Sequence, residues 1–204
     1  MGPRHLLIAL VVALALAAGV FVALRSQAPA TPVAAMMLPR PDPVPGFSLV
    51  DQHGNPVDQT VFVGQWDLVF FGFTHCPDVC PTTLQVLSAA IGTLAAKGQD
   101  PLPRIVLVSV DPERDTPAIM GRYVDYFGDG NLGITGSPEE VRQLADGLGI
   151  YFQKQPSDGD NYVVDHSAAV LVIDPEGRLS ALFSGPHTID NFIHDLPIVM
   201  TGAR

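Results

Sequence analysis

The 204-residue sequence predicts an α/β domain preceded by a single membrane-spanning helix. Two apolar runs, Leu68–Phe73 and Ile105–Val110, are typical of strands that are covered on both faces of a sheet. A helical pattern follows each run, and alternation of strands and helices is characteristic of α/β architecture. The third observation is an uncharged apolar segment near the N-terminus, Leu6–Leu24.

This apolar segment, residues 6–24, matches the roughly 20 residues that a membrane-spanning helix needs. A cleaved signal peptide is the alternative, but its apolar region is usually shorter, about 7–15 residues. We therefore expect a retained anchor. Arg4 before the span and the large domain after it place residues 1–5 in the cytoplasm. The domain then faces the periplasm of a bacterium or an equivalent oxidising space.

The segment that follows the span is rich in proline. Six of the 19 prolines of the chain lie between residues 25 and 45. Such segments adopt extended, semi-rigid conformations. Residues 25–45 are therefore predicted to be a linker that holds a folded domain, residues 46–204, away from the membrane.

The charge of the chain limits the partners that it can have. There are 21 acidic and 11 basic side chains, which gives a formal net charge of −10 at pH 7, and every acidic residue lies beyond residue 25. An acidic body of this kind argues against nucleic acid as a partner. It is compatible with a cationic ligand or a basic protein.

The elements of the domain can be assigned in order. A β-hairpin is expected first, because the turn residues of Asp51–Pro56 separate Phe47–Val50 from Val57. The first buried strand leads into a helix over Pro81–Ala96, whose leucines share one face. The remaining elements are a helix at Pro117–Phe127 capped by Asp115 or Thr116, a strand at Leu132–Thr135, a helix opened by a capping box at Ser137–Glu140, an edge strand at Tyr151–Gln153, a hairpin of Ala168–Ile173 and Leu179–Phe183, and a last helix from Thr188 to Val199 that Pro197 interrupts.

A βαβ unit followed by a hairpin and a helix is the thioredoxin-like arrangement. The sequence thus predicts a thioredoxin-like fold with an added N-terminal β-hairpin.

Only two cysteines occur, Cys76 and Cys80, in the turn between the first buried strand and its helix. Sites in open α/β sheets form at the carboxyl ends of strands. Pro81 suits the first turn of a helix, so both sulfurs are expected near a helix N-terminus, where the thiolate form is favoured. The three-residue spacing leaves open a redox dithiol, a metal site or a buried inert pair. A peroxidase is a weaker alternative, because Thr74 precedes Cys76 by two positions where three are usual.

His166 is the candidate third ligand. It precedes the strand Ala168–Ile173, at the position that faces the cysteine turn in a thioredoxin-like sheet, where thioredoxins carry a cis-proline. Soft thiolates select Cu(I), and imidazole suits copper in either oxidation state. Asp165 is expected to orient the imidazole ring, and Asp78 to lie beside the ligands. The histidines expected outside the ligand set are His53, His187 and His194. His75, beside Cys76, is expected to be an exposed turn residue, with a secondary ligand or a modulator of the cysteine pKa as the alternative.

Zinc is the competing metal, but structural zinc sites usually have four ligands. Three convincing ligands are found here, and an open three-ligand site favours copper transfer.

Three segments carry a resemblance to a known family: FGFTHCPDVCPT from Phe71, SVDPERDTP from Ser109 and YVVDHS from Tyr162. With them the chain resembles the Sco/SenC family of copper proteins over essentially the whole domain. The resemblance implies a thioredoxin-like fold and copper, Cu(I) or Cu(II), bound by the thiolates of Cys76 and Cys80 and the imidazole of His166.

The resemblance also implies a role in assembling the binuclear copper centre of cytochrome c oxidase. The chain would then act as a metallochaperone for the copper-site subunit of the oxidase, or for another periplasmic copper protein. The alternative is a thiol-disulfide oxidoreductase in which Cys76 and Cys80 are the redox-active pair that reduces the cysteines of the recipient. Arg114 and Asp115 are candidates for a partner surface, although a turn with a helix cap accounts for most of their segment.

Overall fold

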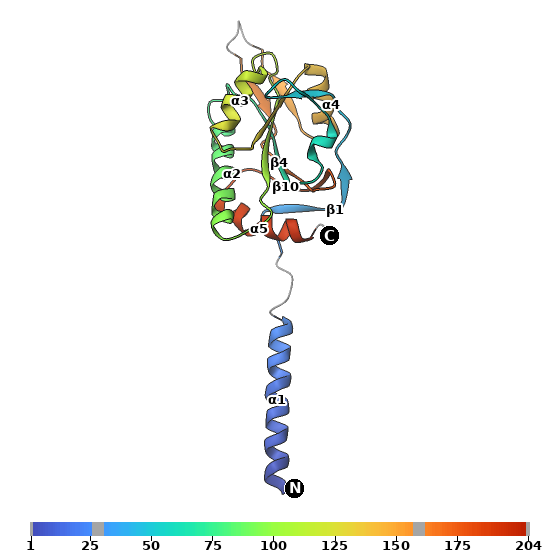
Figure 1. Cartoon of the computed structure of the whole chain (residues 1–204), viewed down its shortest axis with the longest axis vertical. Helices are drawn as coiled ribbons and strands as arrows, with labels where there is room; N and C mark the ends of the chain where they lie inside the picture. Colours follow the sequence, from blue (N-terminus) through green and yellow to red (C-terminus); the bar gives the residue numbers. More distant parts are fainter. Residues whose placement is uncertain (1, 26–30, 157–161, 203–204) are drawn as a thin grey trace. The chain divides into compact units, whose positions relative to one another are not determined.

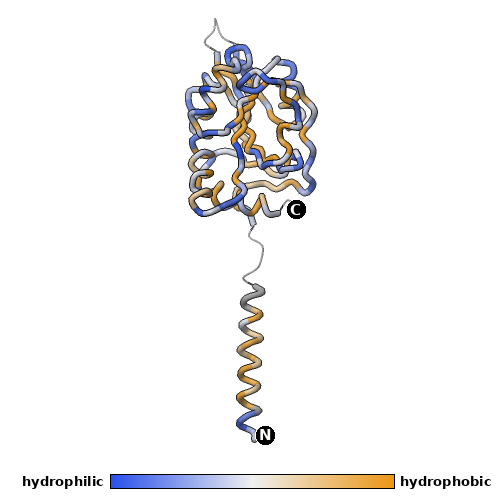
Figure 2. Tube along the Cα trace, in the orientation of Figure 1, coloured by the Kyte–Doolittle hydropathy of each residue, from blue (hydrophilic) through white to orange (hydrophobic). Residues whose placement is uncertain are grey.

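The computed structural model describes residues 2–25, 31–156 and 162–202, which fall into two units divided after Thr31 (Figure 1). The first unit contains one helix, α1 (Pro3–Arg25), and the second contains all other elements. Hydrophobic residues run along α1 after its first turn (Figure 2).

Two helices of the described residues are long and apolar enough to cross a membrane. One is α2 (Val79–Ala96), whose buried residues Leu84, Leu87 and Leu94 belong to the hydrophobic core of the second unit. The other lies in α1, where none of the window Pro3–Phe21 is buried. Of the two, α1 is therefore the candidate span.

The second unit is built on an eight-stranded mixed sheet with the order β1-β10-β9-β4-β5-β6-β2-β3. Its centre is the parallel pair β4 (Asp67–Gly72) and β5 (Arg104–Ser109), which are the two apolar runs of the sequence. β6 (Leu132–Thr135) pairs with β5 in parallel, and β9 (Val170–Ile173) pairs with β4 in antiparallel fashion. β10 (Arg178–Phe183) completes the expected C-terminal hairpin with β9.

The N-terminal hairpin is confirmed as β2 (Leu49–Asp51) and β3 (Pro56–Val57), and β2 joins the sheet through β6. A short 3-10 helix, η1 (Gln59–Phe62), then leads toward β4. The arrangement of the sheet and its helices is consistent with a thioredoxin-like fold.

Within the described residues, four α-helices accompany this sheet. α2 packs against α5 (Ile189–Gly202), and α3 (Pro117–Asp125) packs on β6. α4 (Pro138–Gly147) and α2 lie to either side of β4 (Figure 1). The predicted capping box at the start of α4 forms only in part. Ser137 Oγ accepts from the backbone N–H of Glu140, but the Glu140 carboxylate accepts from the backbone N–H of Ser48.

The predicted linker differs most from the structure. Residues from 32 onward belong to the second unit, and Ala35–Pro43 form β1, an edge strand paired antiparallel with β10. Proline cannot donate a ladder hydrogen bond, but it is tolerated on an edge strand and at irregularities. The register shifts between Met37 and Asp42, across Pro39 and Pro41. The expectation of a linker to residue 45 is therefore wrong from residue 32 onward.

The start of this strand is anchored by Asp195, a buried residue of α5. Its carboxylate accepts hydrogen bonds from the backbone N–H groups of Val33, Ala34 and Ala35 at 2.7–2.9 Å. Burial alone would raise the pKa of Asp195. These hydrogen bonds and a contact with His194 together outweigh burial, so that the pKa lies below its usual value. The carboxylate is therefore stabilised in its charged form.

A second, two-stranded sheet was only partly anticipated. β7 (Phe152–Lys154) corresponds to the expected edge strand, and it pairs antiparallel with β8 (Val164–His166). Among the residues that the structure describes, this ribbon forms a sheet of its own, separate from the eight-stranded sheet. It carries His166 at its end, opposite Phe152 in the register.

Candidate metal centre

The cysteine turn begins where β4 ends. Gly72 closes the strand, and α2 starts at Val79, with Asp78 in the N-cap position. Cys76 is half-buried in the turn, whereas Cys80, in the first turn of α2, is fully buried. A Cβ added to Gly72 would lie 3.0 Å from Cys80 Sγ and 2.9 Å from a ring carbon of Phe70. Glycine at this position is therefore what allows Cys80 to pack against the end of the strand.

His166 reaches the cysteines from the separate ribbon. Its Nε2 lies 3.4 Å from Cys80 Sγ, and the candidate ligand atoms of Cys76, Cys80 and His166 all lie within 4.8 Å of one another. Within the described part of the chain, this is the group of three or more histidine, cysteine or acidic side chains that could hold a metal ion.

The imidazole of His166 is oriented by its neighbours. Its Nδ1 lies 3.1 Å from the carbonyl oxygen of Ser167. The rings of Phe70 and Phe73 pack against the imidazole in T-shaped geometry, with interplanar angles of 73° and 85°. When Nδ1–H donates to this carbonyl, Nε2 is left with a lone pair directed at the sulfurs. That tautomer is the one a metal ligand requires.

The two thiols of the metal-free site differ in acidity. The hydrogen bond from the Cys80 thiol lowers the pKa of Cys76 to about 5, despite burial, with help from the backbone N–H groups of Cys80 and Asp78. The same hydrogen bond and burial raise the pKa of Cys80. The hydrogen bond therefore favours the thiolate at Cys76, the more exposed of the two, and the thiol at Cys80.

The two acidic residues expected around the ligands have other partners. Asp165 is exposed, and its carboxylate accepts from the side-chain amide of Gln155. Successive side chains of a strand point to opposite faces, so Asp165 leaves β8 on the side away from His166. The group next to the His166 ring nitrogen is the Ser167 carbonyl, 3.1 Å from Nδ1. Asp78 accepts from the Thr82 hydroxyl at 3.3 Å and reaches Cys76 through its backbone N–H.

The other four histidines of the second unit make other contacts. His53 lies exposed in the β2–β3 turn, and His75 Nδ1 lies 3.1 Å from Thr74 Oγ1. His187 Nε2 contacts the carbonyl of Ala168 at 2.6 Å, and His194 contacts Asp195.

The sequence interpretation missed a buried polar network beneath the cysteine turn. Asp115 is fully buried, and it accepts from the Thr74 backbone N–H, the Thr74 hydroxyl and the Ser109 hydroxyl at 2.6–3.1 Å. Burial raises the pKa of Asp115, partly offset by these hydrogen bonds. Asp115 is therefore not a surface residue for a partner. It ties the loop before Cys76 to the end of β5, while Thr116 occupies the N-cap of α3.

The side chains of this site can do two things, bind a metal ion or form a disulfide. Two thiolates and one imidazole form a soft, open ligand set for a metal ion. The same thiols form a disulfide when they are oxidised, and oxidation removes the thiolates that a metal needs.

Comparison with known proteins gives a consistent result. The family model described as SCO1/SenC matches residues 36–201. A protein of Stutzerimonas stutzeri, named as a candidate copper-binding protein, is 35% identical over 83% of this chain and 82% of its own length. The mitochondrial protein SCO2 homolog of Mus musculus is 39% identical over 74% of this chain, which spans only 59% of that relative. The copper-bound crystal structure of ScoI from Arabidopsis thaliana is 34% identical, with a TM-score of 0.72 over 78% of this chain and 98% of that one.

Proposed function

Because the chain belongs to the SCO1/SenC family, we propose that it binds copper through Cys76, Cys80 and His166 and delivers it to a recipient protein. The observation that carries the proposal is the convergence of two sulfurs and one imidazole nitrogen within 4.8 Å, from two separate elements. The family resemblance supports the copper-site subunit of cytochrome c oxidase as the recipient. Another copper protein of the same compartment is the alternative recipient.

The donor set fits copper on chemical grounds. Thiolates prefer Cu(I), and imidazole accepts copper in both oxidation states. Cys76 is only half-buried, which leaves the group partly accessible to a partner, as a site that releases its metal needs. A relative named for copper binding and a solved ScoI structure with copper bound support this choice of metal.

A Cu(I) competition titration of the full chain in detergent micelles tests the proposal. We expect one copper per chain, with affinity that falls steeply in His166→Ala and in either Cys→Ser variant. His53→Ala is the matched control, because His53 lies exposed in a turn, and it should bind as the wild type does. Binding that is indifferent to His166 would refute the three-ligand site.

The alternative function is reduction of the cysteines of the recipient. The unequal acidity of the two thiols supports it, because a thiolate at Cys76 can attack a disulfide and Cys80 can then displace the reduced partner. His166→Ala separates the two functions. It should abolish copper delivery to an oxidase copper-site fragment, and it should leave reduction of a disulfide in that fragment largely intact.

We also propose that α1 anchors the chain in a membrane, with residues 1–5 on the cytoplasmic side and the copper site in the periplasm or an equivalent space. The length and hydropathy of α1 support this proposal. Cysteine-labelling reagents that do not cross membranes should modify Cys76 in intact spheroplasts. Modification only after lysis would contradict this orientation.

A further inference from the structure

The ribbon that carries His166 has little support from the main sheet. β7 and β8 have three residues each, and in the described part of the chain they pair only with one another. Isolated two-stranded ribbons are marginal in water, so contacts with the body of the protein must fix this one. The position of the candidate third ligand therefore depends on side chains that lie outside the ligand set.

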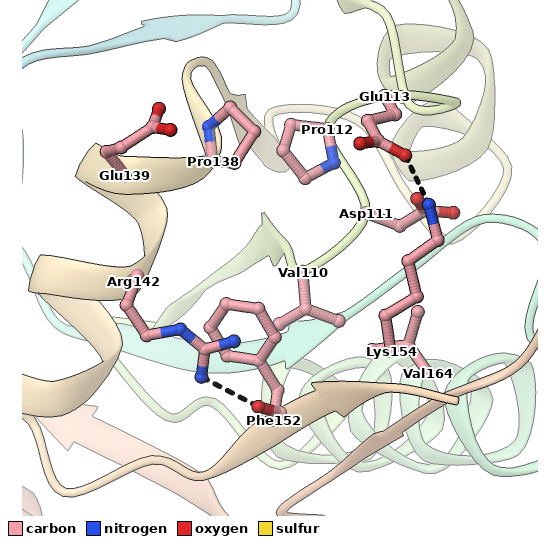
Figure 3. A pocket seen from close by; sticks show the side chains of 10 residues that line it. All are labelled: Val110, Asp111, Pro112, Glu113, Pro138, Glu139, Arg142, Phe152, Lys154 and Val164. Atoms are coloured by element: carbon pink, nitrogen blue, oxygen red, sulfur yellow. Dashed lines mark hydrogen bonds and ion pairs between the residues drawn. The ribbon is translucent and has the colours of Figure 1, made fainter. Parts of the chain in front are cut away.

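One such contact lies at the end of the ribbon that carries Phe152 (Figure 3). The Arg142 guanidinium, from α4, stacks over the Phe152 ring with 3.5 Å to its centroid, and it donates to the Phe152 carbonyl at 2.7 Å. This contact lies at the His166 end of the ribbon, because His166 is opposite Phe152 in the register. Phe152 and Val164 are also buried in the core, so one side of the ribbon packs on the body of the protein. A second polar attachment lies near the other end, where Val164 begins β8.

The second attachment is a cluster around Tyr162, four residues before His166. Arg114 lies over the Tyr162 ring with 3.7 Å to its centroid, and its Nη2 donates to the Tyr162 carbonyl at 3.2 Å. The Tyr162 hydroxyl donates to Asp111 at 2.6 Å, and Arg114 also forms an ion pair with Asp111. We call Asp111, Arg114 and Tyr162 the clasp. It joins the loop after β5 to the segment that leads into β8.

The clasp is better placed to hold the ribbon than the neighbouring ion pair. Lys154 and Glu113 lie 2.6 Å apart (Figure 3), but both side chains are about half exposed, and exposed pairs contribute little. By contrast, the Asp111 side chain is 2% exposed and the Arg114 side chain 17%. Cation–π and charge-assisted contacts strengthen as water is excluded.

We propose that Arg114 and Tyr162 are positioning residues that hold His166 in place for copper. This inference rests on the proposed copper site. The Arg114 side chain acts through the Tyr162 ring and carbonyl, and so through the backbone of β8, without touching the metal. Loss of a direct hydrogen-bond partner of a metal ligand typically costs 10- to 100-fold in affinity, and the clasp acts one step further out, so we expect the lower end of that range.

The test combines two measurements on the full chain in detergent micelles. In the metal-free protein, Arg114→Gln should increase hydrogen–deuterium exchange of the β8 amides. In a Cu(I) competition titration it should lower affinity about tenfold, which corresponds to about 1.4 kcal/mol. Arg114→Lys should recover part of the loss because it keeps a cation near the ring. Arg178→Gln is the matched control, since its ion pairs lie in the β9–β10 turn, and it should change neither measurement.

A double-mutant cycle distinguishes positioning from general destabilisation. If Arg114 acts through His166, then Arg114→Gln should have no further effect on affinity in the His166→Ala background. Tyr162→Leu provides an independent variant should Arg114→Gln fold poorly, and the same two results are expected of it.

Three results would overturn the inference. The first is a folded clasp variant with affinity within twofold of the wild type, and the second is an equal loss in both backgrounds. Either result, together with a clear effect of His166→Ala, refutes the clasp and leaves the copper site standing. The third is copper affinity that His166→Ala leaves unchanged, which refutes the copper site and the clasp together.

Discussion

Replacement of Asp115 by alanine tests whether the buried network beneath the cysteine turn supports the fold. The carboxylate accepts hydrogen bonds from the Thr74 N–H, the Thr74 hydroxyl and the Ser109 hydroxyl, and alanine would leave all three donors without it. A buried donor that loses its partner costs about 1–3 kcal/mol. Thr74 is only partly buried, so water can replace some of its loss, whereas Ser109 is fully buried.

We therefore expect Asp115→Ala to lower the free energy of unfolding by about 2–4 kcal/mol. The lower end of this range allows for the relief of burying a charged carboxylate, whose pKa is raised by its surroundings. Asp115→Asn keeps one acceptor oxygen in nearly the same shape, so its loss should be about half as large.

Urea unfolding of the metal-free protein, followed by circular dichroism, measures these differences. Asp125→Ala is the control, because Asp125 is an exposed aspartate at the end of α3 and its replacement should change stability by no more than about 0.5 kcal/mol. A loss below about 1 kcal/mol for Asp115→Ala would refute the reasoning that the network bears on stability.

Two further predictions concern the thiols and the N-terminal strand. Because the pKa of Cys76 is lowered to about 5, alkylation of Cys76 by iodoacetamide in the reduced, metal-free protein should reach half its maximal rate near pH 5. Buried Cys80 should stay unmodified. Peptide mapping that finds the midpoint for Cys76 near the ordinary pKa of a free thiol would contradict this. Asp195→Ala should free the amides of residues 33–35 to exchange with deuterium, and exchange no faster than in the wild type would count against the anchor. The pKa of Asp195 is lowered from 3.8, so its contribution to stability is fully present above about pH 3.8 and is lost as the pH falls through the lower folded value.

Elements that depend on local pattern were predictable from the sequence. β4 and β5 appear as apolar runs because both faces of each strand are covered, and Leu84, Leu87 and Leu94 mark the buried face of α2. The cysteine turn was predictable for the same reason, because a strand, two close cysteines and Pro81 follow one another directly.

Elements that depend on distant partners could not be predicted in this way. β1 reads as a linker because of its prolines, and its assignment as a strand depends on β10 and on Asp195, which lies about 160 residues away in the sequence. The buried position of Asp115 likewise depends on its contact with Thr74, 41 residues earlier.

His166 and Asp165 show which side-chain directions can be predicted from the topology and the alternation of a strand. The prediction that His166 faces the cysteines followed from the topology of the expected fold, and the structure brings its Nε2 to 3.4 Å from Cys80 Sγ. The prediction for Asp165 considered its neighbourhood in sequence only. Had β8 been assigned as a strand, the alternation of side chains would have directed Asp165 away from the ring.

X-ray absorption spectroscopy at the copper edge tests the central claim most directly. For the copper-loaded full chain we expect scattering from two sulfur atoms and one nitrogen atom per copper, and loss of the nitrogen in His166→Ala. A spectrum with nitrogen and oxygen scatterers alone, or one that His166→Ala leaves unchanged, would contradict a copper site formed by Cys76, Cys80 and His166.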